Sequence, residues 1–217
     1  MSIRYKTIDG SLYRHIWCVG DIHGCYSLLT SGLSERLFDR AHDLVISVGD
    51  NIDRGSGNLE VLRLLDEPWF ETVVGNHEEI ALDAFATQDG NLWDRSGGSW
   101  FFKLNPEEQT EAVMLLSRFK SMPHVIEVMN NKEKYVITHA DYPSDTYRLG
   151  KDVDYDSLLW SCDRVQNSLM GKHSWINGAD EFIFGHMTFQ QVMRFSNQVY
   201  IDTGAYSSRL LSFYQIK

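Results

Sequence analysis

Three short polar motifs, each directly after an apolar run, constrain the fold of this chain more than any other feature of its sequence. They are Gly-Asp-Ile-His-Gly at residues 20–24, Gly-Asp-Asn-Ile-Asp-Arg-Gly at 49–55 and Gly-Asn-His-Glu at 75–78. Asp21, Asp50 and Asn76 are 29 and then 26 residues apart, about the length of one strand–helix–strand step. Because equivalent ends of parallel strands meet at one edge of a sheet, we expect the three motifs to come together there.

The side chains at these strand ends are ligands that divalent cations use in hydrolases. Asp21 and His23 are two positions apart, so both can point toward one metal ion. The carboxylate of Asp50 is placed to bridge two cations, and two later predicted strands end in His139 and His186. We therefore predict a site for two divalent metal ions with six ligands: Asp21, His23, Asp50, Asn76, His139 and His186. This mixture of oxygen and imidazole donors favours Mn²⁺, with Fe and Zn as alternatives.

The order of the predicted elements indicates an α/β fold in one domain that spans residues 1–217. Apolar runs precede the three motifs at 16–19, 44–48 and 72–74, and helices are predicted at 26–37, 58–65 and 77–87. A further helix is predicted from Pro106, capped by Asn105, to about Met122. The second half is richer in strands, predicted at 125–128, 134–138, 181–184, 199–203 and 210–216. Residues 142–178 are predicted to form a lid or substrate-facing insertion, with one short helix near 154–160.

Charge and cysteine content narrow the class of partner and the cellular compartment. The net charge of −10 argues against a nucleic-acid partner, which normally requires a basic face. No apolar run approaches the length of a membrane span, so no membrane partner is expected. The three cysteines are widely spaced and odd in number, which indicates free thiols in a reducing compartment. We therefore expect a cytoplasmic protein.

A phosphoryl-transfer role for the motif residues follows from their neighbours. His77 follows the ligand Asn76, so we expect it beside the metals as the general acid that protonates the leaving alkoxide. Asp53 is expected to orient His77, and the guanidinium of Arg54 to clamp the phosphate. Two cations that share a water can lower its pKa enough to supply hydroxide as the nucleophile.

The same residues resemble the signature of the phosphoprotein phosphatase family of metallophosphoesterases, and most closely the small bacterial and phage lambda protein phosphatases. Besides the three motifs, the resemblance includes His-Ala-Asp at 139–141, Phe-Gly-His at 184–186 and Gly-Gly-Ser-Trp-Phe-Phe at 97–102. It implies a central β-sandwich of mixed sheets flanked by α-helices. It also implies Mn²⁺-dependent removal of phosphate from phosphoserine and phosphothreonine of proteins, with phosphotyrosine left open. No obligate regulatory subunit is expected.

One position departs from the family pattern. Phage-type relatives carry a second phosphate-binding arginine two residues after a tryptophan, and here that position, after Trp160, holds Cys162. Arg164 is the nearby candidate for the missing clamp. The predicted phosphate-binding residues are therefore Arg54, Asn76 and Arg164, and we expect Arg54→Ala to cost more activity than Arg164→Ala. Asp202, in Ile-Asp-Thr-Gly-Ala at 201–205, is expected at most to orient a ligating histidine.

Three other functions compete with a protein phosphatase. A dinucleoside polyphosphate hydrolase shares nearly the same motifs, but such relatives are longer and usually carry Asp where this chain has Glu78. A nuclease or cyclic phosphodiesterase is disfavoured by the acidic charge and by the Asp53-Arg54-Gly55 element. A binding scaffold without activity would typically lack the general acid or several ligands, whereas here His77 and all the ligand positions are filled.

Overall fold

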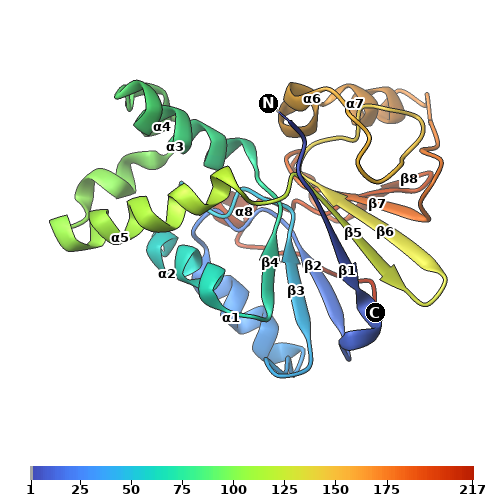
Figure 1. The fold of residues 1–217 in the computed structure, drawn as a ribbon, viewed down its shortest axis with the longest axis horizontal. Coiled ribbons are helices and arrows are strands. Elements are labelled where there is room, and N and C mark those ends of the chain that lie inside the picture. Colours follow the sequence, from blue (N-terminus) through green and yellow to red (C-terminus); the bar gives the residue numbers. More distant parts are fainter. Residues whose placement is uncertain (1) are drawn as a thin grey trace.

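Two β-sheets packed face to face form the centre of the molecule, and helices cover the outside (Figure 1). The structure is a computed structural model that describes residues 2–217. The predicted α/β fold with a central sandwich of mixed sheets is confirmed. Branched and aliphatic side chains from both sheets fill the space between them, among them Ile16, Ile46, Ile126, Ile137 and Ile183.

The four-stranded sheet carries the three motifs. Its strands β2 (Ile16–Val19), β3 (Leu44–Ser47) and β4 (Phe70–Thr72) run parallel, and β10 (Phe213–Gln215) pairs antiparallel with β2. Strand β4 ends at Thr72, two residues earlier than predicted. The backbone N–H of Val74 donates to the carbonyl of Pro123 and not to a neighbouring strand. All three motifs therefore follow the same edge of this sheet, as predicted.

The six-stranded sheet supplies the two later histidines. Its strand order is β1 (Tyr5–Asp9), β5 (Val125–Asn130), β6 (Glu133–Thr138), β7 (Glu181–Phe184), β9 (Gln198–Tyr200) and β8 (Met193–Phe195). Because β6 and β7 are parallel neighbours, His139 after β6 and His186 after β7 reach the same edge. The sequence analysis did not predict β1 or β8.

Helices from the first half pack beside the four-stranded sheet and beyond its motif-bearing edge (Figure 1). They are α1 (Tyr26–Glu35), α2 (Asn58–Arg63), α3 (Asn76–Thr87), α4 (Asn91–Ser96) and α5 (Pro106–Ser117). The predicted start of α5 is confirmed: Asn105 Oδ1 accepts the N–H of Glu108, and the Glu108 carboxylate accepts the N–H of Asn105. Helix α4 and the 3₁₀ turn at Gly98–Lys103 were not predicted.

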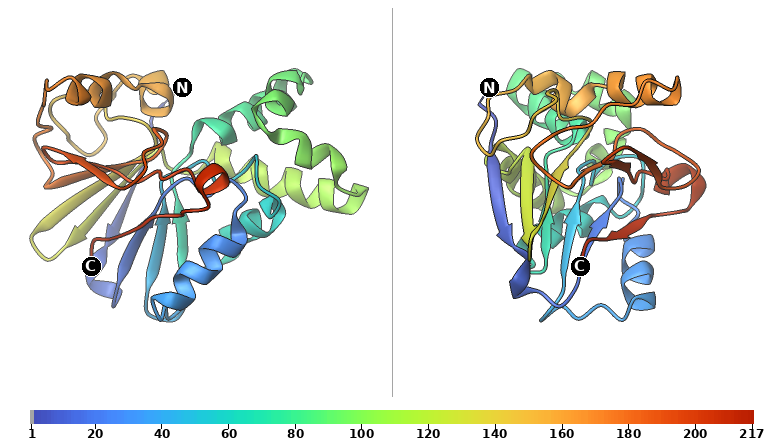
Figure 2. Two further views of the ribbon diagram at one scale, coloured as in Figure 1. Left: turned by 180° about the vertical axis from the view of Figure 1, so that it is seen from behind. Right: turned by 90° about the vertical axis from the view of Figure 1, so that its right-hand side faces the viewer.

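The segment at 142–178 is a packed layer over the outer face of the six-stranded sheet rather than a loose lid (Figure 2). It contains the predicted short helix, α6 (Tyr155–Trp160), and an unpredicted one, α7 (Asp163–Leu169). Its buried side chains pack against Phe182 and Phe184 of β7, and include Tyr142, Tyr147, Leu158 and Val165. No helix within residues 2–217 is long and apolar enough to cross a membrane.

Candidate active site

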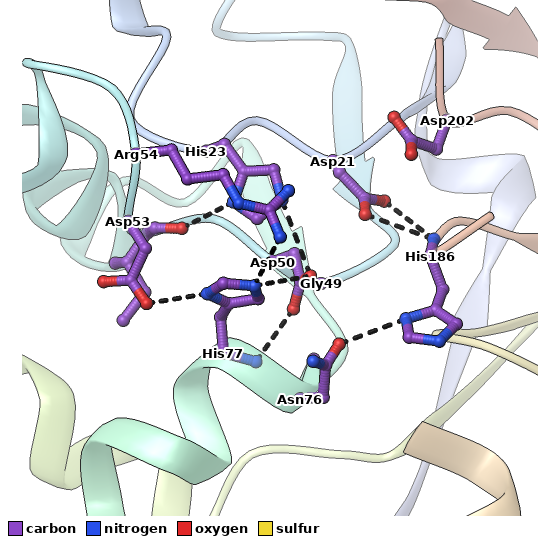
Figure 3. A network of polar contacts seen from close by, with 12 residues as sticks. Asp21, His23, Gly49, Asp50, Asp53, Arg54, Asn76, His77, His186 and Asp202 are labelled. Carbon is purple, nitrogen blue, oxygen red and sulfur yellow. Dashed lines mark hydrogen bonds and ion pairs between the residues drawn. The ribbon is translucent and has the colours of Figure 1, made fainter. Parts of the chain in front are cut away.

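The carboxylate of Asp50 lies at the centre of the predicted metal ligands (Figure 3). Its Oδ2 is 3.6 Å from Nε2 of His23, and its Oδ1 is 3.4 Å from Nε2 of His139. Two groups of donor atoms, each within 4.8 Å of one another, share this carboxylate: one contains His23 and His77, and the other contains His139 and His186. The Asp50 carboxylate is thus placed to bridge two cations. The first group contains His77 and not the predicted ligand Asp21, whose carboxylate oxygens accept the N–H of His186.

Backbone carbonyls fix the orientation of two of the imidazoles. The Nδ1 of His23 lies 2.8 Å from the carbonyl of Ile52, and the Nδ1 of His139 lies 2.8 Å from that of Val48. A carbonyl can only accept, so both Nδ1 atoms carry the proton and both Nε2 atoms present a lone pair to the cluster. This is the tautomer that a metal ligand requires.

Asn76 and His139 meet in a contact that a cation would relieve. The Oδ1 of Asn76 is 2.7 Å from the Nε2 of His139 and 3.2 Å from the Nδ1 of His186. Because the proton of His139 is on Nδ1, its Nε2 and the amide oxygen are two acceptors that face each other. A shared cation satisfies both atoms, so the donor set fits a divalent metal ion.

Burial sets the protonation of the site. It lowers the pKa of His23 and of His186 to about 4, which keeps both imidazoles neutral and able to ligate. Burial also raises the pKa of Asp21 well above its usual range, and the neighbouring Asp202 and Asp50 raise it further. Burial also raises the pKa of Asp50, but the interactions of this carboxylate with the surrounding histidines are stronger and lower its pKa overall.

Asp21 joins the first motif to the end of β7, because both of its carboxylate oxygens accept the N–H of His186, at 3.2 and 3.1 Å. The prediction that Asp202 orients a ligating histidine is not supported. Its carboxylate instead accepts the hydroxyl of Thr188 and the N–H of Gly204. Asp202 therefore shapes the turn that follows the cluster and acts on the site through its charge beside Asp21.

The fully buried carboxylate of Glu78 ties the second motif to the third. Its Oε2 accepts the N–H groups of Asp50 (3.0 Å) and Gly75 (2.8 Å), and its Oε1 accepts those of Asn51 (2.8 Å) and Ile52 (3.3 Å). Burial, followed by the charge of Asp50, raises the pKa of Glu78 to about 7, while these N–H groups favour the ionised form. The sequence analysis used Glu78 only to compare substrate classes and missed this role.

Five non-glycine residues of the site have left-handed backbone conformations. The positive φ angles are 45° at His23, 49° at Asp50, 76° at Asp53, 68° at Arg54 and 64° at His186. Each such residue costs on the order of 1–2 kcal/mol, so the surrounding hydrogen bonds must hold these conformations in place. Strain of this kind is concentrated at functional sites.

The predicted catalytic pair is formed. The Nδ1 of His77 is 2.7 Å from Oδ2 of Asp53, and the other oxygen of Asp53 accepts the indole N–H groups of Trp93 (2.9 Å) and Trp100 (2.8 Å). Although burial lowers the pKa of His77, the carboxylates of Asp50 and Asp53 outweigh it and raise the value overall. Sequence reasoning missed both tryptophans; the only signal was the aromatic run that follows Gly97 and Gly98.

The guanidinium of Arg54 lies at the mouth of the site. Its two terminal nitrogens are 2.8 Å from Nε2 of His23 and 3.0 Å from Nε2 of His77, and the side chain forms no ion pair with a carboxylate within residues 2–217. The backbone N–H of Arg54 donates to the carbonyl of Gly97. Arg54 is therefore held beside the cluster with its charge free for an anion.

Arg164 has no donor left for a phosphate. Its Nε–H donates to Asp141, one terminal nitrogen donates to Asp145 and Ser174, and the other donates to the carbonyls of Tyr142 and Ser144. These contacts use all five N–H groups of a guanidinium. The structure thus does not support Arg164 as the second phosphate clamp. The side chain instead ties α7 to the loop after β6, and Asp141 is one of its partners.

Comparison with known proteins agrees with this site. The family model for calcineurin-like phosphoesterases matches residues 14–204, and the chain belongs to that family. It is 57% identical to serine/threonine-protein phosphatase 2 of Escherichia coli K12, over 100% of this chain and 99% of that protein. It is 46% identical to serine/threonine-protein phosphatase 1 of Salmonella typhimurium, over 93% of this chain and 91% of that protein. The predicted resemblance to bacterial protein phosphatases is confirmed.

The fold also matches a solved structure described as a putative diadenosine tetraphosphatase, with a TM-score of 0.73. That match covers 99% of this chain and 94% of the other, at 20% sequence identity. At this identity the likeness shows the shared fold alone.

The two arginines should respond differently to truncation. We expect Arg54→Ala to lower kcat/KM by about 10²–10³-fold, because it removes a charged donor at the reacting centre. Arg164→Ala should lower the melting temperature while the folded protein keeps kcat/KM within about tenfold of wild type, because its donors are used within the fold. Steady-state kinetics and thermal unfolding of both variants measure this. A larger kinetic loss at Arg164 would contradict the assignment.

Trp93 should act through Asp53 rather than through the substrate. Trp93→Phe keeps a buried ring but removes one N–H from the Asp53 carboxylate. We therefore expect kcat to fall about 5–30-fold, which corresponds to one lost hydrogen bond of about 1–2 kcal/mol, with KM unchanged. Trp175→Phe, at an exposed position, is the matched control. An effect of Trp93→Phe on KM alone would contradict this positioning role.

Proposed function

We propose that this chain is a metal-dependent protein phosphatase that hydrolyses phosphate monoesters of phosphoserine and phosphothreonine, with residues 1–217 acting as one phosphatase domain. The observation that carries the proposal is the pairing of two features: a carboxylate, Asp50, that lies beside His23 on one side and beside His139 and His186 on the other, and the His77–Asp53 pair next to it. The extended similarity to bacterial serine/threonine-protein phosphatases supports the choice of substrate.

Two divalent cations are the proposed cofactors. Asp21, His23 and Asp50 would hold one, and Asp50, Asn76, His139 and His186 the other. When bound, such a pair generates a hydroxide nucleophile and neutralises charge on the phosphoryl group. We propose Mn²⁺ as the native metal, with Fe and Zn as alternatives, because the ligands are oxygen and imidazole rather than thiolate.

The residues around the cluster would perform the remaining work. Arg54 would bind phosphoryl oxygens in a bidentate fork, and Asn76, which lies next to His139 and His186, would complete phosphate binding. In this structure Nε2 of His77 accepts from the Arg54 guanidinium. Once Arg54 binds the phosphate instead, Nε2 would take up a proton and donate it to the leaving alkoxide, while Asp53 holds Nδ1 and favours the protonated ring. Protonation matters because an unprotonated serine or threonine alkoxide is a poor leaving group.

The partners and compartment follow from charge and cysteines. Phosphoproteins are the proposed substrates, phosphotyrosine included as a secondary one, and no nucleic acid or membrane partner is proposed for a chain of net charge −10. Cys18, Cys25 and Cys162 are free thiols, which supports a cytoplasmic location. We propose that the enzyme acts without an obligate regulatory subunit.

The proposed function is tested by comparing two substrates. Metal-stripped protein reconstituted with Mn²⁺ would be assayed on a phosphoserine peptide and on diadenosine tetraphosphate. We expect the peptide to be preferred and its turnover to fall by about 10²–10⁴-fold in His77→Asn, because the general acid is lost. His42→Asn is the control, since His42 is exposed and its ring pairs with Asp39. Preference for the dinucleotide would move the enzyme to nucleotide metabolism and refute the proposal.

A further inference from the structure

A groove of about 780 Å³ begins at the active site. Arg54 lines its inner end, so the residue that faces the metal ligands also opens onto this groove. The walls come from the start of α1, the loop at 54–57, the first residues of α2, the 3₁₀ turn before α5 and the short helix α8 (Ala205–Ser208). A substrate whose phosphate is held by Arg54 would have further parts of its chain within reach of these walls.

Two exposed cations line the groove without a partner. Lys103 and Arg209 take part in none of the ion pairs within residues 2–217. With Arg54 they place three unpaired positive charges in one groove of a protein whose net charge is −10. Such a local concentration of one sign attracts groups of the opposite sign and orients their approach.

The acidic side chains of the groove gather around a different cation. Glu60 and Glu108 also line it, and both act on Arg63, whose guanidinium is paired with Glu111 at 2.7 Å. The Glu108 carboxylate is further engaged by the N–H of Asn105 at the start of α5. Neither carboxylate forms an ion pair with Lys103 or Arg209 within residues 2–217.

The fold holds Arg209 at the groove in a strained backbone conformation. Its φ angle is 64°, and its N–H donates to the carbonyl of Ala205 at the end of α8. The turn before α8 is held in turn by Asp202, which accepts the N–H of Gly204 beside the metal ligands. Arg209 lies near enough to Cys25 for its charge to oppose the rise in thiol pKa that burial causes. The backbone at Arg209 is thus fixed by α8, which places the arginine at the wall of the groove.

Aromatic side chains complete the lining. Tyr26, Trp100 and Tyr206 present ring surface to the groove, and the indole N–H of Trp100 is already used by Asp53. These rings offer contact to aliphatic parts of a peptide, while the cations offer contact to carboxylates.

We propose that this groove binds the polypeptide beside the phosphorylated residue and selects acidic side chains there through Lys103 and Arg209. The inference rests on the proposed protein phosphatase function and names the substrate class of the same site: phosphopeptides with Asp or Glu flanking the phosphoserine. An exposed ion pair contributes up to about 1 kcal/mol, so each cation should change kcat/KM by on the order of threefold.

The test uses full-length, Mn²⁺-loaded enzyme and three phosphoserine peptides of equal length, flanked on both sides by Asp, by Asn or by Lys. The quantity measured is the ratio of kcat/KM between peptides, which is insensitive to the fraction of active protein. The double variant Lys103→Gln/Arg209→Gln removes the charges, and Lys103→Glu/Arg209→Glu reverses them. Lys132→Gln, in the exposed turn between β5 and β6, is the charge-matched control for a single substitution.

We expect wild type and the Lys132→Gln control to prefer the Asp peptide over the Asn peptide by about three- to tenfold, and 0.5 M NaCl to reduce this preference through screening. The Gln variant should lose the preference, and the Glu variant should prefer the Lys peptide. Equal use of the Asp and Asn peptides by wild type, or an unchanged ratio in the Gln variant, would overturn the inference. Turnover of p-nitrophenyl phosphate without turnover of any peptide would refute the proposed function itself, and the inference with it.

Discussion

The buried carboxylate of Glu78 is the interaction on which the rest of the site depends. It lies at the start of α3, yet it accepts backbone N–H groups from the loop after β3 as well as from Gly75. Two loops that end different strands are thus fixed to one side chain. Because Asp50 lies in the first loop, and Asn76 and His77 follow Gly75, this carboxylate sets the distance between Asp50 and His77. A side chain at Gly75 would collide with Asp50, so the close approach also requires a glycine there.

The same principle is repeated around the cluster: His23, His139 and Asp53 are each held by neighbouring groups. Carbonyls of Ile52 and Val48 fix His23 and His139, and the indoles of Trp93 and Trp100 hold Asp53. Without these supports the strained backbone of the ligand loops would relax. These hydrogen bonds therefore serve to position the side chains of the site.

Most of what could be predicted from the sequence came from the three local motifs and the two strand-terminal histidines. The proposed ligands Asp50 and His186 could be singled out because strand-end position and side-chain chemistry are both local properties. The parallel pairing of β6 with β7, which brings their ends together, was not predicted. The tryptophans that hold Asp53 could not be predicted, since their contact depends on how α4 and the following 3₁₀ turn fold back over the site. The prediction that Arg164 binds phosphate is not supported for a similar reason. Its position in the sequence suggested that role, whereas its tertiary contacts use every N–H donor of the guanidinium.

The most direct test of this account is the metal affinity of Glu78→Gln, which keeps the size of the side chain but replaces one acceptor oxygen with a donor. Calorimetric titration of metal-stripped protein with Mn²⁺ should show two ions bound per chain in wild type. If Glu78 positions the ligand loops, the variant should remain folded by circular dichroism and bind Mn²⁺ about 10–100-fold more weakly. Binding of two ions with wild-type affinity by Glu78→Gln would contradict the account.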